Sequence, residues 1–363
     1  MTTVVLSAGG TGGHLFPAQA LAEELARRGT QIIIMTDRRG ANLAKIFPDA
    51  VIETVPAATF TGRSLLRKFF AFVEIALGVA AAYGKLSRLK PAAVVGFGGY
   101  PSLPVMLAAS FAELPTAILE QNTVLGRVNR LVADRMKVVA AAFPIVRHAP
   151  KDPSKVVMTG NPVRPEVIAL SDMPYAPPGE EGPIRLVVFG GSQGARVLSE
   201  VVPAAIALLP DTLRHRMEIV QQCRQEDLSE VRAGYAAINV RAQLASFFTD
   251  LPAHMASAHL VISRSGAGTL SELAAIGRPA ILIPFPYAMD DHQTPNADLF
   301  VQAGAGWHIA QSDLAPPLLA EILEKIFADS ASLAERATAA RTLAIPDATK
   351  RLADVVESIE VRI

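Results

Sequence analysis

Short, continuous apolar runs recur along the whole chain, and most are followed by glycine or polar residues. The runs are TVVLS, QIIIMT, AAVVGF, TAILE, KVVAAA and KVVMTG in the first half, and RLVVFG, EIVQQ, HLVISR and PAILIP in the second. Runs of this length and composition are typical of strands buried on both faces of a parallel sheet.

Segments with helical periodicity separate several of these runs. After the first run, Pro17 is expected near the first turn of a helix and Gly29 at its end. The apolar residues at helical spacing between them are Ala18, Leu21, Ala22 and Leu25. Strands that alternate with amphipathic helices predict an α/β fold with parallel sheets covered on both faces.

A glycine-rich pattern occurs twice and predicts two domains. GGTGG at Gly9–Gly13 and GGSQG at Gly190–Gly194 each follow an apolar run and precede a helical segment, 181 residues apart (190 minus 9). Two Rossmann-like domains are therefore expected, joined within Gly160–Pro183, where Pro, Gly and acidic residues interrupt the periodicity. Ligands of such folds bind at the carboxyl ends of the strands, so the sequence predicts a cleft between the domains there.

Composition limits the classes of partner and compartment. The chain has 363 residues, half of them hydrophobic. A chain of this length usually forms more than one hydrophobic core. Its 34 basic residues balance its 34 acidic ones, so no overall charge attracts it to nucleic acid. The single cysteine, Cys223, excludes an internal disulfide and fits a reducing cytoplasm. The first ten residues lack a basic region, so they read as a strand rather than a signal peptide.

Four glycine-containing segments are candidate anion-binding loops: GGTGGH, GFGGYPS, GGSQGAR and SRSGAGTLSE. Such a loop between a strand and a helix brings ligands close to the backbone and directs free amide groups at an anion. Any one of them could equally be a tight turn, but four in two domains favour binding. The dinucleotide fingerprint fails because Leu15 occupies the third small position, and no loop ends in Gly-Lys-Ser/Thr. Nicotinamide and ATP are therefore disfavoured as ligands.

Several motifs together resemble the MurG family of bacterial glycosyltransferases, in family 28 with the GT-B fold. They are AGGTGGHLFPA, GFGGYPSLP, EQN, TGNPVR, GGSQGAR, SRSGAGTLSEL and DDHQTPNA, and the resemblance runs from about Val4 to Leu299. It implies inverting transfer of N-acetylglucosamine from UDP-GlcNAc to the 4-hydroxyl of the muramoyl sugar of lipid I, forming lipid II for peptidoglycan and cell wall synthesis. No cofactor is implied.

The resemblance also implies how the two domains divide the work. An N-terminal domain, residues 1–160, would bind the lipid-linked acceptor and the membrane, with 345–363 packing back on it. A C-terminal domain, residues 161–344, would bind UDP-GlcNAc. The protein is then expected at the cytoplasmic face of the bacterial inner membrane, as a peripheral protein on an anionic surface.

His14 is the candidate general base. It follows the first glycine loop where a helix would begin, and the positive end of a helix dipole favours the neutral ring, which can accept a proton. Orienting the turn is its alternative role. Asp37, at the end of the second run, competes as base or partner, or is a helix cap. The acceptor diphosphate is expected on Gly12, Gly13, Gly98, Gly99 and Tyr100.

The family pattern assigns the donor UDP-GlcNAc to residues from both halves of the chain. They are Thr11, Gly12, Gly13, Asn122, Arg164, Ser192, Phe248, Ala267, Gly268, Thr269, Leu270, Ser271, Glu272 and Gln293. Glu272 would bind the ribose hydroxyls, Ser192 and Arg164 the diphosphate, and Asn122 and Gln293 the sugar. Phe248 stands where the family has an isoleucine beside the uracil.

Each of these assignments has a structural alternative. Glu272 lies three residues after Thr269, which is also the spacing of a capping box. Arg164 could form a salt bridge between the domains. The DDHQ stretch, Asp290–Gln293, resembles a metal site, although the family pattern implies none.

Gly62–Pro91 combines an apolar centre, Phe69–Ala82, with basic ends. Its charged residues are Arg63, Arg67, Lys68, Lys85, Arg88, Lys90 and Glu74. The centre is expected to be too short to span a bilayer, and a core helix is one reading. Because a lipid-linked acceptor requires membrane docking, we expect an interfacial helix whose cations meet anionic headgroups.

The sequence is also compatible with two other functions. A related GT-B enzyme, such as a transferase with another acceptor or a UDP-GlcNAc epimerase, would share the donor half. A non-catalytic UDP-sugar-binding protein would bind the donor without consuming it.

Overall fold

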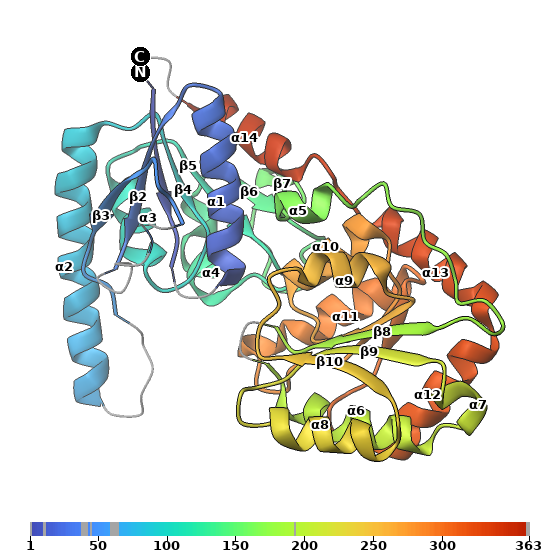
Figure 1. Ribbon diagram of the computed structural model, residues 1–363. Coiled ribbons are helices and arrows are strands. Elements are labelled where there is room, and N and C mark those ends of the chain that lie inside the picture. The colour runs from blue at the N-terminus through green and yellow to red at the C-terminus, as the bar shows by residue number, and fades with distance from the viewer. Residues whose placement is uncertain are drawn as a thin grey trace. The chain divides into compact units, whose positions relative to one another are not determined.

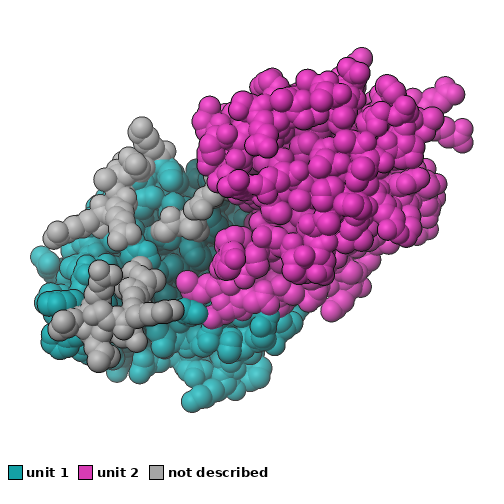
Figure 2. Space-filling view, turned by 90° about the horizontal axis from the view of Figure 1, so that it is seen from below, with its two compact units in different colours: residues 1–163, 345–363 teal, residues 164–344 magenta. Residues whose placement is uncertain are grey.

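Two parallel β-sheets form the framework of the protein in the computed structural model (Figure 1). The structure describes residues 2–9, 12–37, 43, 46–58, 65–191 and 194–360, without the side chains of 65–68. The chain divides into two compact units, which are coloured separately in Figure 2. Each unit contains one sheet. Unit 1 comprises Met1–Val163 and Ile345–Ile363, and unit 2 comprises Arg164–Ala344.

Unit 1 contains a seven-stranded sheet in the order β3-β2-β1-β4-β5-β6-β7, with every neighbouring pair parallel. Its strands are β1 (Thr3–Ser7), β2 (Gln31–Thr36), β3 (Val51–Thr54), β4 (Ala93–Gly96), β5 (Thr116–Glu120), β6 (Val138–Ala141) and β7 (Val156–Met158). Its helices are α1 (Gly12–Arg27), α2 (Leu65–Leu89), α3 (Ser102–Phe111), α4 (Arg127–Val132) and α14 (Ala348–Ile359), with 3₁₀ turns at Ala133–Arg135 and Pro153–Lys155.

Helices cover both faces of this sheet because its central strands are apolar on both sides. Val4 and Leu6 of β1 pack in one cluster with α1 and α14, whereas Val5 packs in another with α2 and α3. The C-terminal α14 is held against α1 by Arg28, which pairs with Asp354 at 2.6 Å and Glu357 at 2.8 Å. The last helix of the chain thus completes the first unit.

Helix α2 packs one face on unit 1 and exposes the other. The buried positions are Ala71, Ile75, Gly78, Ala82 and Leu86, which recur at helical spacing. At Gly78 an added Cβ would lie 2.0 Å from the backbone oxygen of Pro56. Glycine at this position therefore allows α2 to pack closely against the backbone at Pro56.

Unit 2 contains a six-stranded parallel sheet in the order β10-β9-β8-β11-β12-β13. Its strands are β8 (Ile184–Phe189), β9 (Met217–Gln222), β10 (Arg241–Ala245), β11 (Leu260–Ser263), β12 (Ala280–Leu282) and β13 (Gly306–His308). Its helices are α5 (Pro165–Ile168), α6 (Arg196–Leu208), α7 (Asp211–Arg214), α8 (Leu228–Ala237), α9 (Leu251–Ser257), α10 (Ala267–Ile276), α11 (Gln293–Gln302), α12 (Pro316–Ala328) and α13 (Ser330–Thr342), with a 3₁₀ turn at Met289–Asp291.

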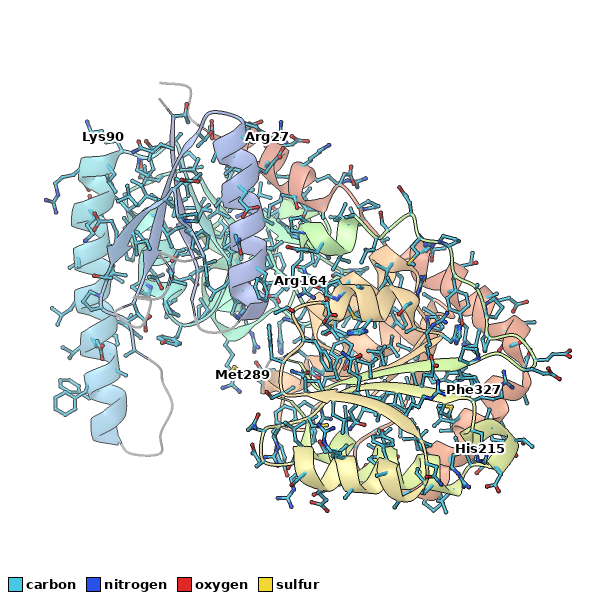
Figure 3. All side chains as sticks on the ribbon, viewed as in Figure 1. Arg27, Lys90, Arg164, His215, Met289 and Phe327 are labelled. Carbon is cyan, nitrogen blue, oxygen red and sulfur yellow. The ribbon has the colours of Figure 1, made fainter. Side chains whose placement is uncertain are left out.

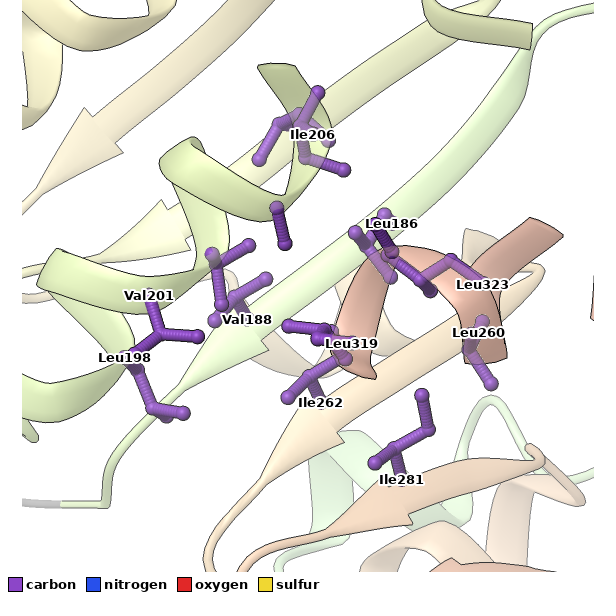
Figure 4. Packing of buried hydrophobic residues seen from close by; sticks show 14 of the residues in the cluster. Leu186, Val188, Leu198, Val201, Ile206, Leu260, Ile262, Ile281, Leu319 and Leu323 are labelled. Carbon is purple, nitrogen blue, oxygen red and sulfur yellow. The ribbon is translucent and has the colours of Figure 1, made fainter. Parts of the chain in front are cut away.

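The core of unit 2 lies between its sheet and helices α6 and α12 (Figure 4). Leu186 and Val188 of β8 pack in the same cluster as Leu198 of α6 and Leu319 and Leu323 of α12. Truncating one such leucine to alanine typically costs about 2 to 5 kcal/mol of stability. This packing holds β8 and β11 side by side and so fixes where their glycine loops begin.

Both sheets have the same doubly wound order, and this order positions the candidate site. In each unit the first and fourth strands are adjacent, so the connections from them lead away in opposite directions. Ser7 of β1 is paired with Gly96 of β4, and Phe189 of β8 with Ser263 of β11. Ligands of doubly wound folds bind at such switch points. The prediction of two Rossmann-like domains is confirmed, and all four glycine segments follow these four strands.

The structure differs from the sequence-based expectation at some element boundaries. Strands β3, β10 and β13 were not predicted, and each lies at the edge of its sheet. Helix α1 begins at Gly12, so Gly12 and Gly13 form its first turn and Pro17 lies further inside it than expected.

Candidate active site

In unit 1 the candidate catalytic residues gather at the switch point between β1 and β4. His14 is the third residue of α1, and its ring lies against Gly98 and Gly99, which follow β4. A Cβ added to Gly98 would be 3.3 Å from His14 Cε1, and one added to Gly99 would be 3.4 Å from His14 Cδ2 and 2.8 Å from the oxygen of Gly9. The first and second glycine segments are therefore in contact, with the imidazole between them.

These two glycines also have a backbone conformation that other residues rarely adopt. Gly98 has φ +83° and Gly99 has φ +74°, both in the left-handed region. Positive φ and the close ring together explain why glycine is needed at both positions. The segment thereby brings bare backbone beside a side chain that can accept a proton.

Tyr100 and Asp37 form a second pair within unit 1. The Tyr100 hydroxyl donates a hydrogen bond to Asp37 Oδ2 at 2.7 Å, and Asp37 is buried directly after β2. This bond joins the segment after β4 to the end of β2. Asp37, the alternative candidate for the general base, is therefore hydrogen-bonded to a tyrosine.

A buried carboxylate, which the sequence analysis did not single out, organises the loop after β5. Glu120 accepts hydrogen bonds from Gly126 N at 2.8 Å, Asn129 Nδ2 at 2.9 Å, Asn122 N at 3.0 Å and Asn122 Nδ2 at 3.2 Å. Burial raises the pKa of Glu120, and these donors oppose the rise. Asn122, expected to contact the sugar, is held by this carboxylate. The signal in the sequence was a charged residue ending the otherwise apolar run TAILE.

Gly12 and Gly13 contribute the start of α1. The amide groups in the first turn of a helix have no intrahelical partner and can bind an anion. Thr11, also assigned to this segment, lies outside the described residues.

In unit 2 the arginine and the glutamate assigned to the donor are bonded to each other. Arg164 Nε donates to Glu272 Oε1 at 2.7 Å and its Nη2 to Glu272 Oε2 at 2.9 Å. Burial lowers the pKa of Arg164, but the bonds and charge of Glu272 outweigh burial, and the pKa is raised. Both residues belong to unit 2, so this salt bridge of Arg164, which is labelled in Figure 3, does not join the two domains as suggested.

Helix α10 presents its first turn after β11. Gly266 is its N-cap, and no side chain caps the helix, so the capping box suggested for Thr269 and Glu272 does not form. Within the expected donor segment, Gly268, Thr269 and Glu272 are partly exposed. Ala267, Leu270 and Ser271 are buried, and Ser271 Oγ donates to the oxygen of Ala267 at 2.9 Å. The buried members can contribute backbone amides rather than side chains.

Gln293 begins α11 and is tied to the loop after β12 and to the start of α10. Its Oε1 accepts a hydrogen bond from Phe285 N at 2.9 Å, and its backbone oxygen accepts one from Ser265 Oγ at 2.7 Å. Asn296 Nδ2 donates to Ser265 O at 3.1 Å. These bonds orient the Gln293 amide, whose NH₂ group is the end suited to donate to a sugar.

The remaining donor residues are Phe248 and Ser192. Phe248 follows β10, is buried, and packs edge-on against His254 with ring centroids 5.3 Å apart. Ser192 lies outside the described residues.

The DDHQ stretch does not gather metal ligands. Among the described residues, no group of three or more His, Cys, Asp or Glu side chains is placed to hold a metal ion. In that stretch Asp291 Oδ1 accepts from Thr294 Oγ1 at 2.6 Å, while Nδ1 of His292 lies 2.8 Å from the oxygen of Met289.

The outer face of α2 is apolar and exposed. Phe69, Phe70 and Phe72 are each more than 60% exposed, and Leu77 is 61% exposed. In the described part of α2, the stretch Phe69–Leu89 is long and apolar enough to cross a membrane by length and composition; it extends seven residues beyond the predicted apolar centre, Phe69–Ala82. Its buried face nevertheless packs on the core of unit 1. Among its predicted cations, Lys85 is paired with Glu53; Arg63 and the side chains of Arg67 and Lys68 lie outside the described residues.

Comparison with known proteins gives matches over nearly the whole chain. Models of the glycosyltransferase family 28 N-terminal and C-terminal domains match residues 4–141 and 185–352. The chain is 49% identical to the UDP-N-acetylglucosamine--N-acetylmuramyl-(pentapeptide) pyrophosphoryl-undecaprenol N-acetylglucosamine transferase of Granulibacter bethesdensis, over 98% of this chain and 93% of that protein.

Solved structures give the same picture of the fold. The crystal structure of Acinetobacter baumannii MurG has a TM-score of 0.82 and 30% identity, and the match covers 99% of this chain and all of that one. The Neisseria meningitidis UDP-GlcNAc 2-epimerase has a TM-score of 0.65 at 13% identity, over 99% of this chain and 100% of that one, which shows the shared GT-B fold alone. The chain therefore belongs to glycosyltransferase family 28 and, within it, to the family of the UDP-N-acetylglucosamine--N-acetylmuramyl-(pentapeptide) pyrophosphoryl-undecaprenol N-acetylglucosamine transferases.

Proposed function

We propose that this protein transfers N-acetylglucosamine from UDP-GlcNAc to the 4-hydroxyl of the muramoyl sugar in undecaprenyl-diphosphate-linked lipid I, forming lipid II for peptidoglycan synthesis. The observation that carries the proposal is the similarity to curated transferases of this specificity, at 49% identity over 98% of the chain for the Granulibacter bethesdensis protein. The two glycine-lined switch points support it, since one can hold the donor diphosphate and the other that of the acceptor.

In the proposed division of labour, unit 2 binds the donor. Amide groups at the start of α10 bind the diphosphate, and Glu272 accepts from the ribose hydroxyls while Arg164 holds the carboxylate in place. Gln293 contributes its NH₂ group to the sugar. The contacts within unit 2 support this assignment because they orient Glu272 and Gln293 before a ligand arrives.

Unit 1 binds the acceptor and supplies the base. The 4-hydroxyl oxygen attacks the anomeric carbon, a bond forms between them, and the bond from that carbon to the UDP oxygen breaks. His14 takes the hydroxyl proton, and UDP leaves with the negative charge. A single displacement inverts the anomeric centre. The position of His14 beside Gly98 and Gly99 supports this role, and the Tyr100–Asp37 pair makes Asp37 the less suitable base.

The reaction is proposed to need no metal, because the backbone amides at the start of α10 can stabilise the departing diphosphate. The acceptor's lipid remains in the membrane, so the protein is proposed to act as a peripheral protein at the cytoplasmic face of the inner membrane. The exposed phenylalanines of α2 support docking of its apolar face to a leaflet, which is expected to be anionic.

The direct test incubates the protein with UDP-GlcNAc and a short-chain lipid I analogue, with excess chelator present. We expect UDP and the β-linked disaccharide product to form together. Release of UDP without the acceptor, or conversion of UDP-GlcNAc to its 2-epimer, would assign the protein to another GT-B activity. Binding of UDP-GlcNAc without turnover would make it a binding protein.

A further inference from the structure

A second arginine of unit 2 is buried among neutral groups. Arg264 directly follows β11 and is 8% exposed. Its Nη1 donates to the backbone oxygens of Ile283 and Pro284, both at 3.1 Å, and its Nη2 to Gln311 Oε1 at 2.7 Å. The guanidinium carbon lies 5.4 Å from the centroid of the Phe285 ring. Each of these four groups is uncharged.

Within the described part of the chain, no carboxylate forms an ion pair with Arg264. Burial lowers its pKa, but a guanidinium remains protonated at any physiological pH. Moving a charge into the protein interior without an opposite charge costs several kcal/mol. The neutral hydrogen bonds engage both terminal nitrogens of Arg264 but leave its positive charge without a counter-charge.

The surroundings along the chain increase this imbalance. Arg264 is followed by Ser265 and by Gly266, the N-cap of α10. The N-terminus of a helix carries partial positive charge. A buried cation and a positive helix end thus lie next to each other at the carboxyl end of β11.

Arg278 in the same unit is a second buried arginine that is bonded to backbone oxygens. It is 2% exposed, and its guanidinium donates to the oxygens of Ile276, Gly277 and Ala256. These carbonyls end helices α10 and α9, where the partial charge is negative. Burial and the charge of Arg341 lower the pKa of Arg278 to about 10, so the carbonyls do not fully offset its burial. Arg278 lies before β12, at the amino end of the strands, and is therefore remote from the candidate site.

We propose that the buried charge of Arg264 attracts the diphosphate of the nucleotide sugar. The same charge stabilises the negative charge that develops on UDP as the sugar leaves. The donor supplies the counter-charge that the fold omits. This inference rests on the proposed binding of the donor to unit 2. Its effect extends through space, so it adds to the contacts of the α10 amides rather than replacing them.

The proposal separates charge from shape. Arg264→Met removes the charge, and Arg264→Gln removes it while keeping an amide that can donate to Ile283 or Pro284. Titration calorimetry with UDP and with uridine, under conditions where circular dichroism shows the variants folded, measures both affinities. We expect the UDP affinity to fall by about tenfold, as for two unit charges about 12 Å apart at an effective dielectric constant of about 20, and the uridine affinity to stay unchanged.

The conservative variant gives a readout that a structural role would not move. A lysine buried at this position would have a lowered pKa, so in Arg264→Lys the UDP affinity should fall as pH rises from 7 to 9, whereas the affinity of the native protein should not change through loss of this charge. Arg278→Met is the matched control and should leave the ratio of UDP to uridine affinity unchanged.

Equal losses of UDP and uridine affinity in Arg264→Met and Arg264→Gln would show that Arg264 only braces the loop, and unchanged UDP affinity would also overturn the proposal. Failure of the donor assignment is distinguishable, because Glu272→Gln would then leave UDP-GlcNAc binding unchanged as well.

Discussion

The Arg164 guanidinium and the Glu272 carboxylate face each other in a fork, joined by hydrogen bonds of 2.7 Å and 2.9 Å. Two parallel bonds fix the plane of the carboxylate as well as its position. The arginine begins unit 2 and the glutamate lies on α10, 108 positions later in the chain. Each of two residues assigned to the donor therefore depends on the other for its orientation.

This pairing predicts the kinetics of Glu272→Gln and Arg164→Lys. Both variants should raise the KM for UDP-GlcNAc more than they lower kcat, because the proposed role of the carboxylate is to bind ribose and not the reacting atoms. Steady-state kinetics with varied donor measures the split. In the double variant the losses should be less than additive, with a coupling of about 0.5 to 3 kcal/mol. A drop in kcat at unchanged KM would contradict ribose binding.

Gly98→Ala should impair catalysis through His14. Alanine at φ +83° is strained, and its Cβ would press on the imidazole at 3.3 Å, so we expect kcat to fall by about tenfold. Gly29→Ala is the matched control, since Gly29 has φ +88° with no atom within 4 Å of an added Cβ. Both variants should lose roughly 1 kcal/mol of stability, measured by urea unfolding. Equal kcat values in the two would disprove the contact.

His259 should make unit 2 sensitive to acid. Burial, then the charges of Arg185, Arg278 and Arg216, lower the pKa of His259 from 6.5 to about 4. Because the unfolded chain binds this proton more readily, the free energy of unfolding should fall as pH drops from 6.5 to 4, by about 3 kcal/mol in total. His259→Asn, which can still accept from the Arg185 backbone N–H, should flatten this slope. A slope unchanged by the substitution would contradict the shift.

The phenylalanines on the outer face of α2 should determine membrane binding. Replacing Phe69, Phe70 and Phe72 by serine removes side chains that each contribute roughly 1.5 to 3 kcal/mol when buried in an apolar phase. The partition coefficient onto phosphatidylglycerol vesicles, measured by cosedimentation, should fall at least a hundredfold. Phe247→Ser, at a residue of unit 2 that is 70% exposed, is the control and should bind normally. Undiminished binding of the triple variant would refute docking through α2.

The sequence predicted the interior of both sheets better than their edges. Central strands such as β1 and β8 are apolar on both faces and therefore stand out as continuous runs. Edge strands such as β3 and β10 have exposed positions, so VIET and RAQLA resemble loops in sequence. The order of strands, and hence the switch points, follows from chain crossings that local patterns do not encode.

The candidate site was predictable where glycine segments and motifs mark it, and less so where long-range contacts build it. His14 and Glu272 were identified from their motifs. Glu120 and Arg264 lie in the motifs EQN and SRSGAGTLSEL but were given no role, because the sequence does not show that either charge is buried. Their importance comes from burial and from partners such as Asn129 and Pro284, which the fold brings to them.

The central claim is that the imidazole between the glycine segments of unit 1 removes the proton of the attacking hydroxyl. The most direct measurement compares single-turnover transfer to a lipid I analogue by the native protein and by His14→Ala, with UDP-GlcNAc affinity measured in parallel. We predict a rate about a hundredfold or more lower at unchanged donor affinity. A near-native rate for His14→Ala would contradict the account.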